Sequence, residues 1–124
     1  MDAPHVPYDD LLGFRKTVVA PGDVRIELDV DERHHNPMGV LHGGILMGLM
    51  DSAMGNSMTS LLEPGQSTTN SEMQIRFVAP VTAGRLEARA TRLHETARTV
   101  LWEATVVHER QVVARATSTF ICRR

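Results

Sequence analysis

One carboxylate lies within a stretch that otherwise has the composition of a buried helix. Asp51 is the only charged residue of this expected helix, and Gly44, Gly48 and Gly55 share its helical face. Each glycine costs a helix about 1 kcal/mol relative to alanine, so such a stripe indicates close approach by a ligand or another chain. A buried carboxylate without a nearby cation is costly. We therefore favour a functional role for Asp51 over a hydrogen-bonded core residue.

The entrance of the same helix offers donors for a negatively charged oxygen. His42-Gly43-Gly44 places backbone N–H groups without intrahelical acceptors at the positive end of the helix dipole. Gly43 precedes Asp51 by eight residues, about 12 Å along a regular helix. A substrate or an irregular first turn must therefore connect them. Asn36 lies outside the helix and would have to return to Asp51 across a fold or a subunit boundary.

The whole chain has the size and composition of one globular domain, 1–124, which we expect to begin with an N-terminal arm over 1–20. It has 124 residues, of which 42% are hydrophobic and 23% charged. The acidic N-terminus lacks the basic start and apolar run of a signal peptide, and no segment reaches about 18 apolar residues. The one cysteine, Cys122, cannot form an internal disulfide. We expect a cytoplasmic protein without a membrane partner.

Charge is distributed unevenly along the chain. Residues 1–66 carry four Lys and Arg against ten Asp and Glu, whereas residues 67–124 carry nine Arg against five Glu. Arginine matches phosphate and carboxylate groups bidentately, so the second half is either an anion-binding patch or an ordinary solvated sheet face. The net charge of -2 and the scarcity of aromatic residues disfavour a nucleic-acid partner.

Hydrophobic periodicity predicts the elements that must position these residues. Alternation predicts a strand over 24–30, and helical spacing predicts one long helix from about 41 to 62, ended by Glu63-Pro64-Gly65. Four alternating runs follow at about 68–78, 85–93, 99–108 and 112–121, and we expect them to form an antiparallel meander. The fold class is therefore α+β. The helix is apolar on nearly all sides and must be buried, but one sheet can cover only one side of it. A partner subunit is the natural source of the remaining cover, which favours an oligomer.

A set of motif residues resembles that of the phenylacetate-pathway (PaaI-like) acyl-CoA thioesterases of the hotdog fold: Asn36, Gly39, His42-Gly43-Gly44, Asp51, Arg76-Phe77-Val78-Ala79-Pro80 and Gly84. The resemblance covers about residues 24–121. It implies a curved antiparallel sheet of five to six strands around one long central helix, in homodimers that often pair into homotetramers, with two active sites at each dimer interface. It also implies hydrolysis of an acyl-CoA thioester, with ring-bearing, phenylacetyl-type acyl groups a family-level expectation. No metal or cofactor is needed, because coenzyme A is part of the substrate.

The same resemblance assigns roles to individual residues. Asp51 would be the general base or nucleophile, and the Gly43 N–H would polarise the thioester carbonyl, with Gly44 beside it. Asn36 and His42 stand where relatives place groups that orient the thioester or the water. For His42, a purely structural role at the helix start remains an alternative.

One position departs from the family pattern. Many relatives carry Ser or Thr one turn after the carboxylate, where this chain has Gly55. Asn70 and Asn56 are candidates for the missing support, and we favour Asn70. The segment from Glu95 to Thr99 resembles the turn that contacts the nucleotide end of coenzyme A.

In that segment, Thr96 and Thr99 would bind substrate and Arg98 would contact a phosphate. Equally, Arg98 could be an ordinary solvated residue of the turn. Two other functions remain open: a hydratase or dehydratase acting on acyl thioesters, with His42 as its histidine, and a noncatalytic acyl-CoA binding protein. His34, His35 and His42 only weakly suggest a metal site.

Overall fold

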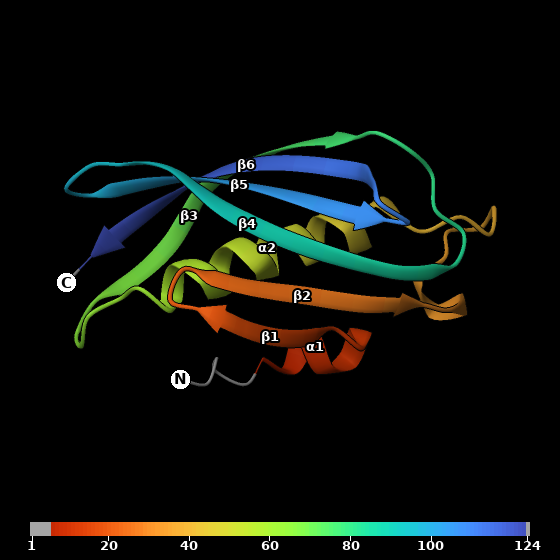
Figure 1. Ribbon diagram of the computed structural model, residues 1–124, viewed down its shortest axis with the longest axis horizontal. Coiled ribbons are helices and arrows are strands. Elements are labelled where there is room, and N and C mark those ends of the chain that lie inside the picture. The colour runs from red at the N-terminus through yellow and green to blue at the C-terminus, as the bar shows by residue number, and fades with distance from the viewer. Residues whose placement is uncertain (1–5, 124) are drawn as a thin grey trace.

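The computed structural model describes residues 6–123, which form six strands curved around one long helix (Figure 1). The elements in chain order are α1 (Pro7–Leu12), β1 (Arg15–Ala20), β2 (Asp23–Val30), the 3-10 helix η1 (Glu32–His34), α2 (Gly43–Thr59), β3 (Ser67–Phe77), β4 (Gly84–Glu95), β5 (Thr99–His108) and β6 (Gln111–Arg123). The strands form one antiparallel sheet in the order β1-β2-β4-β5-β6-β3. The expected α+β hotdog arrangement is confirmed.

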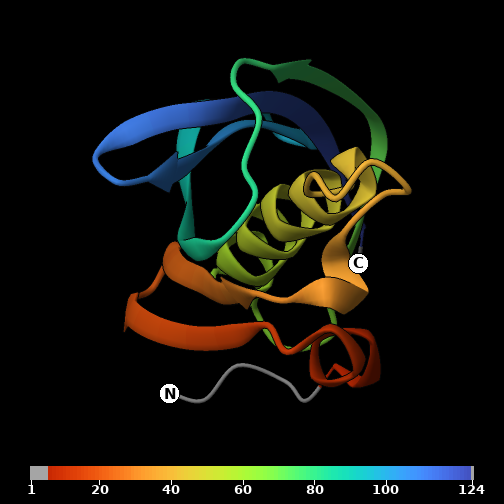
Figure 2. The ribbon, with the colours of Figure 1, turned by 90° about the vertical axis from the view of Figure 1, so that its right-hand side faces the viewer.

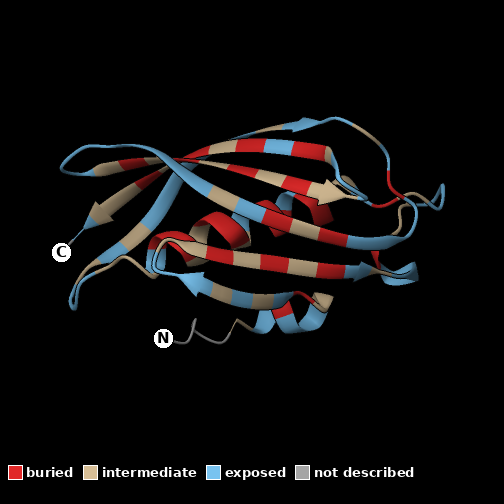
Figure 3. Ribbon diagram, viewed as in Figure 1, coloured by how far each residue is buried: buried red, intermediate tan, exposed pale blue. Residues whose placement is uncertain are grey.

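The core lies between α2 and the concave face of the sheet. Figure 2 shows the strands curving around α2, with α1 beside it at the β1 edge. Alternate residues of β2 and β5 point inward, so buried and partly buried positions follow one another along each strand (Figure 3). Buried Trp102 donates its Nε1–H to the Met58 sulfur at 3.2 Å. Although α2 is apolar, no helix within residues 6–123 is long and apolar enough to cross a membrane.

The predicted meander holds for β4, β5 and β6 but is wrong for β3. The β5–β6 hairpin turns through Glu109 and Arg110, both with positive φ, as tight two-residue hairpins require. By contrast, β3 pairs with β6 at the far edge of the sheet. The connection of residues 78–83 carries the chain from that edge to β4, which pairs with β2. Connection length alone did not distinguish this crossover from a hairpin.

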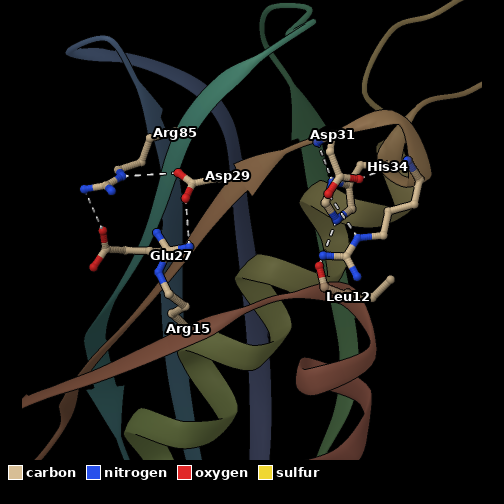
Figure 4. A network of polar contacts seen from close by, with 8 residues as sticks. Leu12, Arg15, Glu27, Asp29, Asp31, His34 and Arg85 are labelled. Carbon is tan, nitrogen blue, oxygen red and sulfur yellow. Dashed lines mark hydrogen bonds and ion pairs between the residues drawn. The ribbon is translucent and has the colours of Figure 1, made fainter.

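The segment expected as an arm contains two elements that periodicity did not predict. Residues 1–5 lie outside the described part of the chain, but α1 and β1 follow, and β1 extends the sheet beyond β2. The buried His34 ring fixes the end of α1. Its Nδ1 accepts from the Asp31 N–H at 2.9 Å, and its Nε2 donates to the Leu12 carbonyl at 2.8 Å (Figure 4).

A second network in Figure 4 links three neighbouring strands on the outer face. Asp29 of β2 bonds Arg15 of β1 at 3.0 Å and Arg85 of β4 at 3.4 Å. These side chains are exposed, so each pair contributes about 1 kcal/mol or less. The network supports strand order but does not hold the fold together.

Candidate active site

Asp51 lies on the side of α2 that the rest of the chain leaves uncovered. The exposed or partly exposed residues on this side are Gly44, Met47, Asp51 and Gly55, and 45% of Met47 is exposed. Gly48 differs from the other glycines of its face, because a Cβ there would overlap the Tyr8 hydroxyl of α1. Nothing lies within 4 Å of a Cβ built at Gly55. The glycine stripe therefore serves close packing at one position and leaves open space at another.

Asn70 of β3 holds the Asp51 carboxylate. Its Nδ2 donates to Asp51 Oδ1 at 3.0 Å and to the Ser118 hydroxyl at 3.3 Å. The fully buried Ser118 in turn donates to the Glu72 carbonyl at 2.6 Å. A carboxylate only accepts, so both amide hydrogens are used, and the network fixes the orientation of Asn70. Ser118 was not identified as a site residue from the sequence.

The alternative support, Asn56, does not face Asp51. Its Nδ2 donates to the Ser52 carbonyl of α2 at 2.8 Å, so its amide is occupied by the helix backbone. Of the two asparagines, Asn70 is therefore the one beside the carboxylate.

A β-bulge aims Asn70 at the helix. Asn70 pairs with Phe120 and Glu72 pairs with the adjacent Thr119, which leaves Ser71 as an extra residue. This insertion reverses the alternation of β3, so that Asn70 and Met73 both face α2. A regular strand would have directed one of them outward. The only sequence signal is that the apolar positions from Met73 onward are out of phase with Asn70.

The environment makes Asp51 a weaker acid than a free aspartate. Although Asp51 is accessible from the open side of α2, its neighbours partly remove water from the carboxylate and so raise its pKa. The Asn70 hydrogen bond opposes this rise in pKa, and the negative charge of Asp9 adds to it. Asp51 therefore keeps its proton to a higher pH than a solvated aspartate does. Once ionised, it is a correspondingly better proton acceptor.

At the entrance of α2, only one of the two expected glycine donors is open. His42 is the N-cap, and its Nδ1 accepts from the Gly44 N–H at 2.8 Å. This geometry does not support the expected substrate contact of the Gly44 N–H. Within residues 6–123, the Gly43 N–H donates to no acceptor. Gly43 thus supplies the open main-chain donor at this end of α2, and His42 shapes the turn that presents it.

An apolar hollow adjoins the Gly43 donor. It encloses about 350 Å³ and is lined by the following residues: Leu41, Gly43, Leu46, Phe77, Val78, Ala79, Pro80 and Val81. A Cβ at Gly43 would lie 3.1 Å from Phe77 Cζ, so the glycine lets the aromatic ring approach the helix end. The hollow suits an apolar group attached to a polarised carbonyl.

Asn36 is placed by a turn rather than by Asp51. Its Oδ1 accepts from the backbone N–H groups of Met38 and Val40, at 2.9 and 3.2 Å. Its Nδ2 donates to no group in the described chain, so it is available to a ligand or to another subunit. Within residues 6–123, Asn36 and Asp51 share no hydrogen bond.

Because α2 is a regular helix, it keeps the Gly43 N–H and the Asp51 carboxylate far apart. The helix runs without interruption from Gly43 to Thr59, so of the two alternatives, a substrate or an irregular first turn, the irregular turn is absent. Gly43 and Asp51 of one chain are therefore about 12 Å apart along the axis. They do not reach the same carbonyl group within one subunit.

The turn between β4 and β5 lies at the opposite end of the molecule from the α2 entrance (Figure 1). The hydroxyls of Thr96 and Thr99 bond each other at 2.7 Å and close this turn. Arg98 makes no ion pair with a described residue, and it lines an open pocket of about 580 Å³ together with Arg123. Sequence analysis did not single out Arg123, which shares this pocket because the neighbouring Cys122 N–H donates to the Arg98 carbonyl at 2.8 Å.

The three histidines considered as metal ligands have separate partners. His34 bonds Asp31 and Leu12, whereas His35 Nε2 bonds the Thr82 carbonyl at 2.8 Å. Within the described part of the chain, no three His, Cys, Asp or Glu side chains are grouped closely enough to hold a metal ion.

Comparison with known proteins gives consistent matches. The profile of the thioesterase superfamily matches residues 38–115. The chain is 28% identical to the 1,4-dihydroxy-2-naphthoyl-CoA hydrolase of Listeria monocytogenes over 81% of each protein. It is 29% identical to the proofreading thioesterase EntH of Klebsiella pneumoniae, over 80% of this chain and 72% of EntH. Among solved structures, a mutant of the phenylacetic acid degradation protein PaaI from Thermus thermophilus superposes with a TM-score of 0.86 at 30% identity, over 94% of this chain and 98% of PaaI.

The hydrogen-bond geometry predicts how Asp51 titrates. Asn70→Ala removes the bond that favours the ionised carboxylate, so the pKa of Asp51 should rise further above its ordinary value. Asn56→Ala is the matched control, because that amide bonds the helix backbone, and it should leave the titration unchanged. The carbon-13 shift of the Asp51 carboxyl followed against pH measures both. Equal titration curves for the wild type and Asn70→Ala would contradict the inferred contact.

Proposed function

Because the chain belongs to the thioesterase superfamily, we propose that it hydrolyses acyl-CoA thioesters to a free acid and coenzyme A. The observation that carries this proposal is Asp51, an aspartate with a raised pKa that Asn70 holds on an otherwise uncovered helix face. Relatives named as thioesterase and as CoA-ester hydrolase support the reaction class.

In the proposed reaction, Asp51 acts on the carbonyl carbon either through water or directly. As a base, it takes a proton from water while the water oxygen bonds the carbon. The tetrahedral intermediate then breaks its C–S bond, and the leaving thiolate recovers the proton. As a nucleophile, Asp51 would displace the thiolate and form an anhydride that water hydrolyses. Asn70 occupies Oδ1 in either case, which leaves Oδ2 to act. No cofactor is required.

We propose that Gly43 and Asp51 of different subunits complete one site. Their axial separation of about 12 Å, at about 1.5 Å per residue, prevents them from sharing a carbonyl within one chain. The outer edge of β3 is unpaired in the described chain and is eleven residues long, and Phe77 at its end is 55% exposed. Pairing of two β3 edges would extend the sheet and cover the Asp51 side of α2. The proposed assembly is a homodimer, with homotetramers formed from two dimers.

Arg98 and Arg123 are proposed to bind the phosphates of coenzyme A, with the Thr96 and Thr99 turn alongside. Both residues line one open pocket, and arginine recognises phosphate bidentately. For the acyl group, we propose an aryl or phenylacetyl-type substrate. The apolar hollow beside Gly43 and the aromatic substrate in the name of the Listeria relative support this class.

The two alternative functions are less well supported. A hydratase would need His42 as a catalytic base, but its Nδ1 already accepts from the Gly44 N–H. A noncatalytic acyl-CoA binding protein agrees with the open space at Gly55, yet it leaves the raised pKa of Asp51 without a purpose.

The first test is thiol release from a panel of aryl, short, medium and long acyl-CoA esters. Wild-type protein should release coenzyme A, and Asp51→Asn should lower kcat by about 1,000-fold or more while folding normally. Asp10→Asn, which removes an exposed carboxylate of α1, is the control and should retain activity. Binding without release by the wild type would identify a binding protein, and hydration of an enoyl-CoA would identify a hydratase.

The main-chain donor is tested by a pair of substitutions at the first residue of α2. Gly43→Pro removes the N–H but suits the first helical position, and His42 already has the extended conformation that a following proline requires. We expect kcat to fall about 100- to 1,000-fold. Gly43→Ala adds a similar contact with Phe77 but keeps the donor, so it should fall much less.

If kcat falls equally in Gly43→Pro and Gly43→Ala, the loss of activity comes from the contact with Phe77 rather than from removal of the N–H donor.

Refolding Gly43→Pro together with Asp51→Asn should restore about a quarter of wild-type activity, because random pairing forms dimers with one intact site. No recovery would contradict a site shared between subunits.

Arg98→Ala tests the proposed phosphate contact. It should raise KM for acyl-CoA esters about tenfold, the value of one charge-assisted hydrogen bond, and leave kcat nearly unchanged. Acyl-pantetheine esters lack the nucleotide, so their KM should not change. An equal rise for both ester types would exclude this role of Arg98.

A further inference from the structure

Asp9 of α1 is a buried carboxylate that the proposed reaction does not use. It is 1% exposed, and its Oδ1 accepts from the Ser52 hydroxyl of α2 at 2.9 Å. Its Oδ2 is the one buried side-chain oxygen or nitrogen in residues 6–123 that has no hydrogen-bond partner. Lys16 of β1 is 3.9 Å away from Oδ2, within ion-pair range but beyond hydrogen-bond distance. An incompletely satisfied buried carboxylate requires an explanation.

The position of Asp9 relates it directly to Asp51. Tyr8 and Asp9 contact α2 at two positions one turn apart, Gly48 and Ser52. These positions flank Asp51, since Ser52 follows it directly and Gly48 lies one turn before it on the same face. Thus α1 forms one side of the Asp51 site, and β3 forms the other through Asn70.

The Lys16 ion pair gives the Asp9 carboxylate one structural role, but the Ser52 hydrogen bond does not require a carboxylate. An asparagine would accept the same Ser52 hydrogen bond without burying a charge, at lower cost in solvation. What aspartate adds is a negative charge beside α2, which carries no other ionisable side chain than Asp51. In partly desolvated surroundings, such a charge acts over several ångströms.

We propose that Asp9 is a positioning residue for Asp51, whose buried negative charge makes the Asp51 carboxylate a stronger base. This inference rests on the proposed function, in which Asp51 accepts a proton. The groups that face Asp51 are Tyr8 and Asp9 from α1 and Asn70 from β3. Those near Asp9 are Lys16 and Ser52, whereas Arg33 and His34 bond carbonyls at the other end of α1.

The direction of the effect is supported by the electrostatics of the cluster. The charge of Asp9 contributes to the raised pKa of Asp51, and the charges of Asp9 and Asp51, after burial, both raise the pKa of the Tyr8 phenol. Removing the Asp9 charge should therefore let Asp51 ionise at lower pH. Activity that needs ionised Asp51 would then extend to lower pH. Asp51 itself would be a weaker base in this variant.

The test compares Asp9→Asn with the wild type in the pH profile of kcat/KM for an ester that the wild type cleaves. The acidic limb should move down by about half a pH unit, as expected for loss of a unit charge near a partly solvated group. Asp10→Asn removes a charge from the exposed side of α1 and should leave the limb in place. Asp9→Asn also removes the ion pair with Lys16, so its melting temperature should fall. A loss of stability alone would not move the acidic limb, which separates the proposed role from a structural one.

The carbon-13 titration of the Asp51 carboxyl makes the result independent of turnover. A lower pKa of Asp51 in Asp9→Asn supports the inference, and an unchanged pKa overturns it. If no ester is cleaved by the wild type, the proposed function fails while the titration still decides the coupling. Asp9→Ala, which is also neutral, replaces Asp9→Asn if the asparagine variant alters the fold.

Discussion

The apolar surface of α2 must be buried, and this requirement determines much of the structure. The helix has seventeen residues and one ionisable side chain, so exposing most of its surface to water would be unfavourable. The curved sheet covers most of it, and α1 covers a further strip at Gly48 and Ser52. What remains open is the strip that carries Asp51. The carboxylate thus lies where the chain cannot complete its own core, and the proposed partner would complete both the core and the site.

The site combines a regular element with an irregular one. The unbroken turns of α2 hold Gly43 and Asp51 at a constant separation, whereas the bulge at Ser71 directs Asn70 onto the carboxylate. Behind Asn70, buried Ser118 of β6 fixes the amide. Three elements distant in sequence therefore determine the environment of one side chain. This explains why its pKa depends on packing as well as on its own helix.

Local patterns predicted the local structure well. The strand expected over 24–30 corresponds to β2, and the expected helix over 41–62 contains α2 with shorter ends. The pairing of β3 with β6 was not predictable, since alternation reports burial but not which neighbour a strand has. Both α1 and β1 were missed because six-residue elements give weak periodic signals. For the same reason Asp9 was unnoticed, although the sequence analysis had named Asp51, Gly43 and Asn70 as candidates.

The open Gly43 N–H belongs to the main chain, and this affects how related sequences can diverge. A side-chain donor is lost by any unsuitable substitution, but a peptide donor is present whichever residue follows His42, proline excepted. Residues around the hollow, such as Leu46 and Phe77, can then change the shape of the proposed acyl pocket without removing the proposed main-chain donor to the carbonyl. Such an arrangement would let substrate preference evolve faster than the chemistry itself.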